Sequence, residues 1–286
     1  MISKIKSNLF AGFFLAKVHF ARRYKRFHLG VFWTFFPTFL VLLGAYISSK
    51  QLDLESFGFK YNYVLYVILP FIIFRGITET FDVSQKLIQL SFILQRSITI
   101  KSHHIFTGCI LASLYYLIVD LFVAIVVIFI FYSDLNGYYL IYLFFFFYSI
   151  FIGVLISCLL GPLCMLIYDF RFISKFLRVL ILAGTPIFYI LPKDGIVSYI
   201  NQFNPFTYIV LASRDVVLSG ITPVVTYTLF STIFSLSIFL FIIIFFEYQI
   251  KIINSTAVRG VVGQTYAWQL ILNTSKKNND KNLKLK

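Results

Sequence analysis

Charged residues are scarce in this chain. Only 13% of its 286 residues are charged, and Asp and Glu together contribute only 11. A soluble globular domain has about 25% charged residues, so this chain has too few polar side chains to cover a water-exposed surface. Disorder is excluded as well, because 59% of the residues are hydrophobic and 20% are aromatic. The solvent expected for most of the chain is therefore a lipid bilayer.

Motifs for nucleotide binding and catalysis are also missing. The chain has no G-x-x-x-x-G-K-[ST] loop, so we do not expect it to hold nucleotide phosphates itself. It has no G-x-S-x-G, H-E-x-x-H or glycine-rich dinucleotide motif either. The adjacent His103 and His104 have no third ligand nearby, so we interpret them as loop residues and predict no metal site. The cysteines, expected to be small buried hydrophobic residues, are Cys109, Cys158 and Cys164.

The sequence does contain a series of long apolar runs. Six of them approach the ~20 residues that an α-helix needs to cross a ~30 Å hydrocarbon core. The shorter alternating segments of a β-barrel are absent, so we predict an all-α integral membrane protein. The predicted spans cover residues 31–47, 61–81, 105–132, 138–168, 172–191 and 223–246.

Basic residues predict the orientation of these spans. Lys and Arg gather in residues 1–30, in the second-to-third and fourth-to-fifth connections, and in the tail 247–286. By the positive-inside rule these regions face the cytoplasm, so both termini are expected there. The opposite connections contain only the basic residues Lys50, Lys60, Lys193 and Arg214.

Residues 1–30 are predicted to form an amphipathic helix on the cytoplasmic membrane surface. A cleaved signal peptide is disfavoured, because no small-residue cleavage pattern precedes the first full span. Lys17 falls on the apolar face, from which its long stem lets the ammonium reach the headgroups. A solvated basic leader is the alternative. At 100° per residue, Asn8, Gly12, His19, Arg22 and Arg26 share one face, and Phe10, Phe13, Phe14, Phe20 and Tyr24 share the other.

Few ionisable residues lie within the predicted spans. Arg75 and Glu79 are four positions apart, so they can pair on one helix face, either as a structural pair or as part of a gate. Asp120 lies midway through the third span and should face protein or water. A structural hydrogen bond to a neighbouring helix and a functional role are both open for it. A proton-driven carrier would be expected to have more such charges.

Three short motifs follow one another along the chain. Residues 22–37 read R-R-Y-K-R-F-H-L-G-V-F-W-T-F-F-P, residues 186–189 read P-I-F-Y, and residues 204–206 read N-P-F. Arg214 and Gly220 follow the third motif. In this order the motifs resemble those of the ABC-2 type permeases that export polysaccharides. The matching positions of the first motif are Leu29, Gly30, Trp33 and Pro37.

The resemblance implies the transmembrane subunit of an ABC transporter in a bacterial cytoplasmic (inner) membrane. Its substrate would be a lipid-linked polysaccharide such as O-antigen, capsule or teichoic acid. Two copies of this chain would form the channel, and two copies of a separate ATPase would bind ATP and Mg. This chain would bind no cofactor, perform no chemistry and contact membrane lipids but no nucleic acid. The alternatives are an ABC-2 exporter of a drug or small lipid, an ion-gradient-driven carrier and a lipid-modifying membrane enzyme.

The connection 191–222 is expected on the outer side, yet it is rich in apolar residues. We therefore expect short re-entrant helices there, with Asn204-Pro205 as the turn between them.

Aromatic and leucine-rich segments give the candidate functional residues. Aromatic faces suit a sliding polymer, but Tyr and Trp are also enriched at membrane interfaces whatever the function. The leucines of residues 84–101 recur at helical spacing and would either dock the ATPase or pack on this chain's own spans. The proposed substrate path comprises Trp33, Tyr61, Tyr63, Tyr66, Tyr115 and Tyr116, and the proposed ATPase-coupling residues are Leu87, Leu90, Leu94, Arg96, Arg22 and Arg26.

Overall fold

The chain is helical and contains no strand in the part that the structure, a computed structural model, describes. That part comprises residues 2–24, 32–51, 62–94, 102–131, 139–166, 169–189, 195–196, 199, 201, 204–218, 233 and 236–239. The helices within it are α1 (Ile2–Tyr24), α2 (Phe32–Gln51), α3 (Tyr63–Leu94), α4 (Ser102–Phe131), α5 (Tyr139–Leu166), α6 (Phe170–Ala183) and α8 (Pro205–Leu218).

Four of these helices, α2 to α5, are long and apolar enough to cross a membrane. They correspond to the first four predicted runs. The largest difference is in α3, which was expected to end near residue 81 but continues to Leu94. Residues 82–94 contain no Gly or Pro that would stop the helix. A prediction from hydropathy recognises only the strongly apolar part of α3 and therefore ends it too early. The apolar windows are Phe32–Gln51, Tyr63–Ser91, His103–Phe131 and Leu140–Cys164.

The fifth predicted span, 172–191, is a helix only in its first part. The helix α6 ends at Ala183, and Gly184 and Pro186 follow it. A proline disfavours helical conformation in the residue before it, which explains why the helix stops before the apolar run does. Most of the sixth predicted span and the whole tail 247–286 lie outside the described residues.

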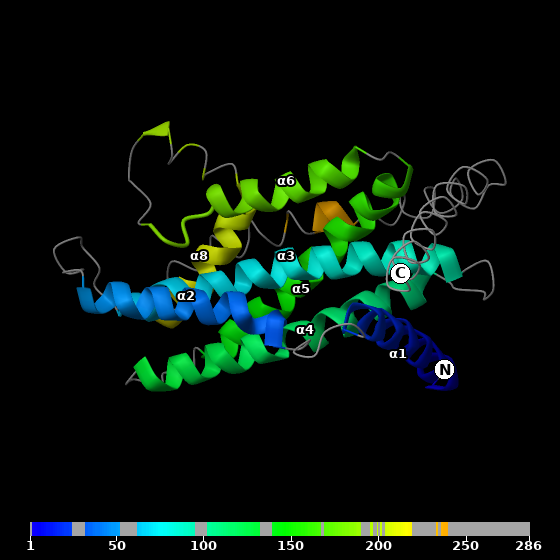
Figure 1. The fold of residues 1–286 in the computed structure, drawn as a ribbon, viewed down its shortest axis with the longest axis horizontal. Coiled ribbons are helices and arrows are strands. Elements are labelled where there is room, and N and C mark those ends of the chain that lie inside the picture. The colour runs from blue at the N-terminus through cyan, green and yellow to red at the C-terminus, as the bar shows by residue number, and fades with distance from the viewer. Residues whose placement is uncertain are drawn as a thin grey trace, which may run out of the picture.

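The helix α3 forms the centre of the bundle. It packs against α2, α4, α5 and α8, and 89% of its apolar window is buried. Figure 1 shows α1 at one end of the bundle, beside the first half of α4, and α8 near the other end, beside α3. We call these the α1 end and the α8 end. A helix surrounded in this way can carry polar side chains that meet partners from several directions.

Small residues bring α3 and α5 unusually close together. A Cβ added to Gly153 would lie 2.6 Å from the Ile77 carbonyl oxygen and 2.7 Å from Cβ of Thr80. A Cβ on Gly76 would collide with the Ser149 hydroxyl. Small residues at such crossings let helix backbones approach and gain van der Waals contact, which is the main source of helix association in lipid.

The helix α8 has a clear sequence-encoded start. Asn204 caps it, because its side-chain oxygen accepts a hydrogen bond from the Phe206 N–H at 3.1 Å. Pro205 follows in the first helical position, where no N–H is needed. Most of the residues from Thr207 to Leu218 are buried, and α8 packs on α3 and α5. The expected turn at Asn204-Pro205 is therefore the beginning of a buried helix.

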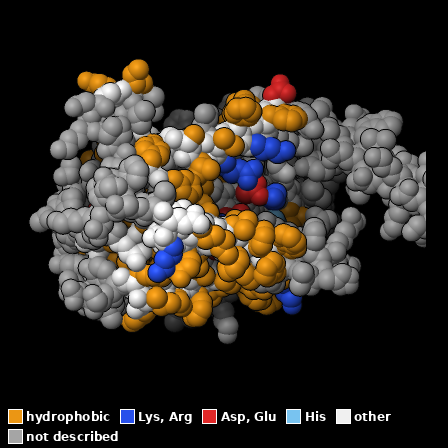
Figure 2. Space-filling view, turned by 60° about the vertical axis from the view of Figure 1, so that its left-hand side comes forward, with side chains coloured by type: hydrophobic (Ala, Val, Ile, Leu, Met, Phe, Trp, Pro, Cys, Tyr) orange, Lys and Arg blue, Asp and Glu red, His pale blue; other side chains and the backbone are white. Residues whose placement is uncertain are grey.

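The outer surface of the bundle is largely apolar. Only 17% of the apolar window of α2 is buried, and Phe39 and Leu43 are exposed. Phe122 and Ile130 of α4 and Phe147 of α5 are also exposed. Figure 2 shows one face on which hydrophobic side chains predominate and charged side chains gather in small groups. Water would disfavour so much contiguous apolar surface, whereas lipid chains would cover it.

Candidate functional site

A buried ionic network joins α2, α3 and α4. Arg75 of α3 pairs with Asp120 of α4 at 2.9 Å between Nη1 and Oδ1. The same guanidinium donates hydrogen bonds to the Thr38 hydroxyl and, at 2.7 Å, to the Thr34 carbonyl of α2. The Thr38 hydroxyl in turn donates to Asp120. Thr38 and Asp120 are fully buried and Arg75 is 7% exposed, so each charge depends on these partners rather than on solvent.

The sequence explains why α2 can offer this site. Pro37 lies inside α2, between the two threonines, and a proline removes one backbone hydrogen bond and distorts the helix locally. Thr34 and Thr38 are four positions apart and therefore share a face. The network thus lies beside the proline of the first motif.

This network modifies the interpretation of the intramembrane charges. The spacing of Arg75 and Glu79 suggested a pair within α3, whereas the structure gives Arg75 an ionic partner on α4. Asp120 faces protein and bonds to neighbouring helices, which was one of its two alternatives. Sequence reasoning missed Thr34 and Thr38. Their spacing around a proline was the available signal.

A second cluster lies at the α8 end, where α3 begins. The Arg214 guanidinium of α8 lies over the Tyr66 ring, 4.2 Å from its centroid. Tyr63 stacks parallel to Tyr66 with centroids 6.4 Å apart. Arg214 also pairs with Asp215 at 2.9 Å, but its buried Nη1 has no hydrogen-bond partner among the described residues. The π face of the Tyr66 ring therefore stabilises the positive charge of Arg214, which hydrogen bonds satisfy only in part.

Backbone carbonyls of the second motif complete this cluster. The Tyr66 hydroxyl donates to the Tyr189 carbonyl at 3.3 Å, and the Tyr63 hydroxyl to the Phe188 carbonyl at 3.5 Å. The side chain of Asn204 donates to the Gly184 carbonyl at 2.8 Å. Segments that are more than a hundred residues apart in sequence thus meet at one place. We call Tyr63, Tyr66, Phe188, Tyr189 and Arg214 the tyrosine–arginine cluster.

The structure does not bring all the proposed path residues together. Tyr63 and Tyr66 are half-buried neighbours, as their spacing predicted. Trp33 is 54% exposed near the start of α2, and its ring contacts Phe32 and Phe36 of the same helix. Tyr115 is exposed on α4, but Tyr116 is 2% exposed and packed among core residues. Tyr61 lies outside the described residues.

Two of the leucines proposed for ATPase coupling, Leu87 and Leu90, are directed into the bundle. Leu87 has no exposed surface and packs with Leu15 of α1 and Ile105 of α4. Leu90 is 5% exposed. Both residues therefore fit the alternative of packing on this chain's own helices, because α1 and α4 cover this face of α3. Arg26, Arg96 and the side chains of Arg22 and Leu94 lie outside the described residues.

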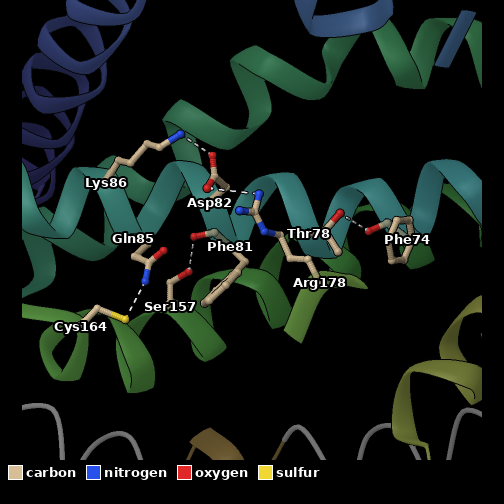
Figure 3. A network of polar contacts seen from close by, with 9 residues as sticks. All are labelled: Phe74, Thr78, Phe81, Asp82, Gln85, Lys86, Ser157, Cys164 and Arg178. Carbon is tan, nitrogen blue, oxygen red and sulfur yellow. Dashed lines mark hydrogen bonds and ion pairs between the residues drawn. The ribbon is translucent and has the colours of Figure 1, made fainter. Parts of the chain in front are cut away.

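Basic and acidic side chains meet where α3 approaches α6. Figure 3 shows Asp82 of α3 between Lys86, one turn further along α3, and Arg178 of α6. The Arg178 Nη1 lies 3.3 Å from the Asp82 Oδ1. Sequence reasoning missed this cluster, although the four-residue spacing of Asp82 and Lys86 was an available signal. This ion pair links α6 to the central helix.

Further polar contacts hold α5 against the same stretch of α3. Ser157 donates to the Phe81 carbonyl at 2.9 Å, and Gln85 contacts the Cys164 sulfur (Figure 3). The three cysteines are free and buried, as expected. In the described part of the chain no three His, Cys, Asp or Glu side chains are grouped to hold a metal ion.

Comparison of the chain with known protein families and with characterised proteins finds no match.

Proposed function

We propose that this chain is the membrane-spanning subunit of an ATP-driven exporter that moves a lipid-linked polysaccharide, such as O-antigen, across a bacterial inner membrane. Two copies would form the channel with six spans each, the last two including residues 172–191 and 223–246. Both termini would be cytoplasmic. A separate ATPase, also in two copies, would bind ATP and Mg, and this chain would do no chemistry on the substrate.

The observation that carries the proposal is the convergence of the motif residues at the α8 end. Tyr189 belongs to the second motif and Arg214 follows the third, yet both contact Tyr66 at the start of α3. The second motif and the arginine that follows the third thus meet on one side chain of α3. This supports the resemblance on which the exporter proposal rests.

The cluster also has the chemistry that a sliding polymer requires. A long polysaccharide must not be held in deep specific pockets, because each site has to release it quickly. The ring of Tyr63 is half-buried and can offer an apolar face to a sugar, whereas Arg214 already covers one face of Tyr66. We therefore assign sugar contact to Tyr63 and positioning of the cluster to Tyr66.

Affinity purification of the full chain from its native membranes tests the proposal. A separate ATPase with Walker motifs should co-purify in equal amount, and deletion of the gene should leave lipid-linked polysaccharide inside the cell. Absence of any ATPase together with unchanged surface polysaccharide would contradict it. A drug or small-lipid exporter would retain the ATPase but leave the surface polymer unchanged in the deletion strain.

The buried charge network is the observation that bears on the alternative of a carrier driven by an ion gradient. Intramembrane acidic residues often mark proton or ion pathways. Here Asp120 is matched by Arg75 and a threonine, which is the arrangement of a structural tie between helices. Transport in reconstituted vesicles separates the two functions, because only the exporter requires ATP and the partner ATPase.

A further inference from the structure

A small apolar pocket with one cationic side chain lies where α1 packs on α4. Its volume is about 240 Å³, and nearly all of its lining is apolar. The lining residues are Phe13, Ala16, Lys17 and Phe20 of α1 and Leu111, Ala112, Tyr115 and Tyr116 of α4. We call it the α1–α4 pocket.

The pocket arises because small residues close one part of the helix contact and aromatic residues hold the next part open. A Cβ on Gly12 would lie 2.4 Å from the Thr107 hydroxyl oxygen, so the two helices nearly touch there. Further along both helices, Phe20 meets Tyr115 edge to face with ring centroids 4.2 Å apart. The bulk of these rings leaves a space that neither helix fills.

The environment of α1 differs from the one that its sequence indicated. Gly12 and His19 were assigned to a polar face at the headgroups, but both are buried and Gly12 contacts α4. The contact occurs because a glycine lets α4 approach the backbone of α1. Phe10 is 74% exposed, and Phe14 and the pocket residue Phe13 are also exposed, so α1 presents an apolar surface that the described residues leave largely uncovered. Lipid is the natural cover for that surface in a chain with four membrane-type helices.

Lys17 is the feature that indicates what the pocket holds. It lines the pocket, is exposed, and makes no ion pair with the acidic residues that the structure describes. The volume lies below the ~300–1,000 Å³ of usual small-molecule sites, so it suits a segment of chain rather than a whole compact ligand. An apolar slot beside an ammonium matches an acyl chain attached to a phosphate.

We propose that the α1–α4 pocket binds one acyl chain of an anionic phospholipid whose phosphate pairs with Lys17. The ammonium supplies charge complementarity to the headgroup, and the aromatic walls contact the chain. Bound lipid would fix α1 along α4 at the membrane surface. This inference needs only a bilayer, so it stands or falls independently of the exporter function.

Native mass spectrometry of the full chain in detergent tests the proposal with phosphatidylglycerol and phosphatidylcholine of identical acyl chains. The unsubstituted chain should retain phosphatidylglycerol in preference. K17Q should weaken its binding about fivefold, the effect of removing one basic residue from an anionic lipid surface, and abolish the preference. A16F should fill the slot and weaken both lipids.

K175Q is the matched control, because Lys175 is exposed on α6 and its ammonium lies 5.7 Å from the centroid of the Phe172 ring, away from the pocket lining. It should bind phosphatidylglycerol like the unsubstituted chain. Equal losses in K17Q and K175Q would mean unspecific charge attraction and overturn the proposal. Unchanged binding in K17Q would overturn the contact between Lys17 and the headgroup. Unchanged binding in A16F would overturn the acyl-chain slot.

Discussion

Asp120 and Arg75 place two opposite charges inside an apolar bundle, where each depends on the other. A buried ion pair contributes little net stability compared with apolar packing, but removal of one partner leaves a desolvated charge behind. Arg75 keeps only neutral acceptors, the Thr38 hydroxyl and the Thr34 carbonyl, when the carboxylate is lost. The consequence is a strong asymmetry between substitutions at this position.

We expect D120A to destabilise the protein by about 3–5 kcal/mol and D120N by less, because the amide still accepts a hydrogen bond. Thermal unfolding in one detergent, with K50Q at an exposed site as the control, measures the difference. Similar midpoints for D120A and K50Q would show that Asp120 is not a structural tie. Retained stability with lost transport in D120N would instead indicate a functional charge.

Tyr63 and Tyr66 are neighbours with different expected roles. Under the proposed export function, Y63A should reduce the amount of exported polysaccharide while stability and ATPase activity persist, because the partner ATPase would still hydrolyse ATP with poorer contact between channel and polymer. Y66A should also lower stability by about 1–2 kcal/mol, because the guanidinium of buried Arg214 loses the ring beneath it. Surface polysaccharide, ATPase rate and unfolding midpoint together separate the two effects.

Y66F is the informative control for this pair. It retains the ring under Arg214 but loses the hydroxyl bond to the Tyr189 carbonyl, so its stability should be closer to that of the unsubstituted chain. Normal export in the Y63A/Y66A double variant would contradict a role in substrate contact and would indicate that both tyrosines belong to the aromatic belt of the membrane interface.

The contact between α3 and α5 depends on the absence of a side chain at Gly153. We expect G153A to destabilise the protein by about 1–3 kcal/mol, since the added Cβ would overlap the Ile77 carbonyl oxygen, which is held in the helix. G44A is the matched control in α2, because a Cβ there meets nothing within 4 Å. It should be neutral or stabilising by about 0.5–1 kcal/mol, the usual gain of Ala over Gly in a helix. Equal shifts of the unfolding midpoint in G153A and G44A would contradict the close approach of α3 and α5 at Gly153.

Hydropathy predicted the first four spans because lipid imposes one simple requirement on length and composition. The same measure underestimated α3, whose residues 82–94 are helical but amphipathic, and overestimated α6, which stops before Pro186. Helical periodicity identifies which residues share a face but not which faces meet. For that reason the sequence allowed a pair between Arg75 and Glu79 and left the role of Asp120 open, but it did not indicate that Arg75 and Asp120 bond to each other.

The two ends of the bundle carry different exposed side chains, and this difference bears on how the molecule is oriented in the membrane. Lys86 is exposed on the second half of α3, the half that approaches the α1 end, whereas Lys50 lies in the last turn of α2, near the α8 end. An exporter with its motor at the α1 end requires that end to be cytoplasmic. If that orientation holds, the tyrosine–arginine cluster lies on the outer side, where a polymer would leave.

Cysteine labelling of intact cells tests this orientation. The native cysteines are free but buried, so they should react little with a membrane-impermeant maleimide. K50C should be labelled from outside, and K86C only after the cells are permeabilised, because both side chains are exposed and lie toward opposite ends of the bundle, on α2 and α3. Labelling of K86C alone would reverse the orientation and place the tyrosine–arginine cluster in the cytoplasm. In that case Tyr63 could receive a substrate before transport but could not release it, and the export path proposed through this cluster would fail.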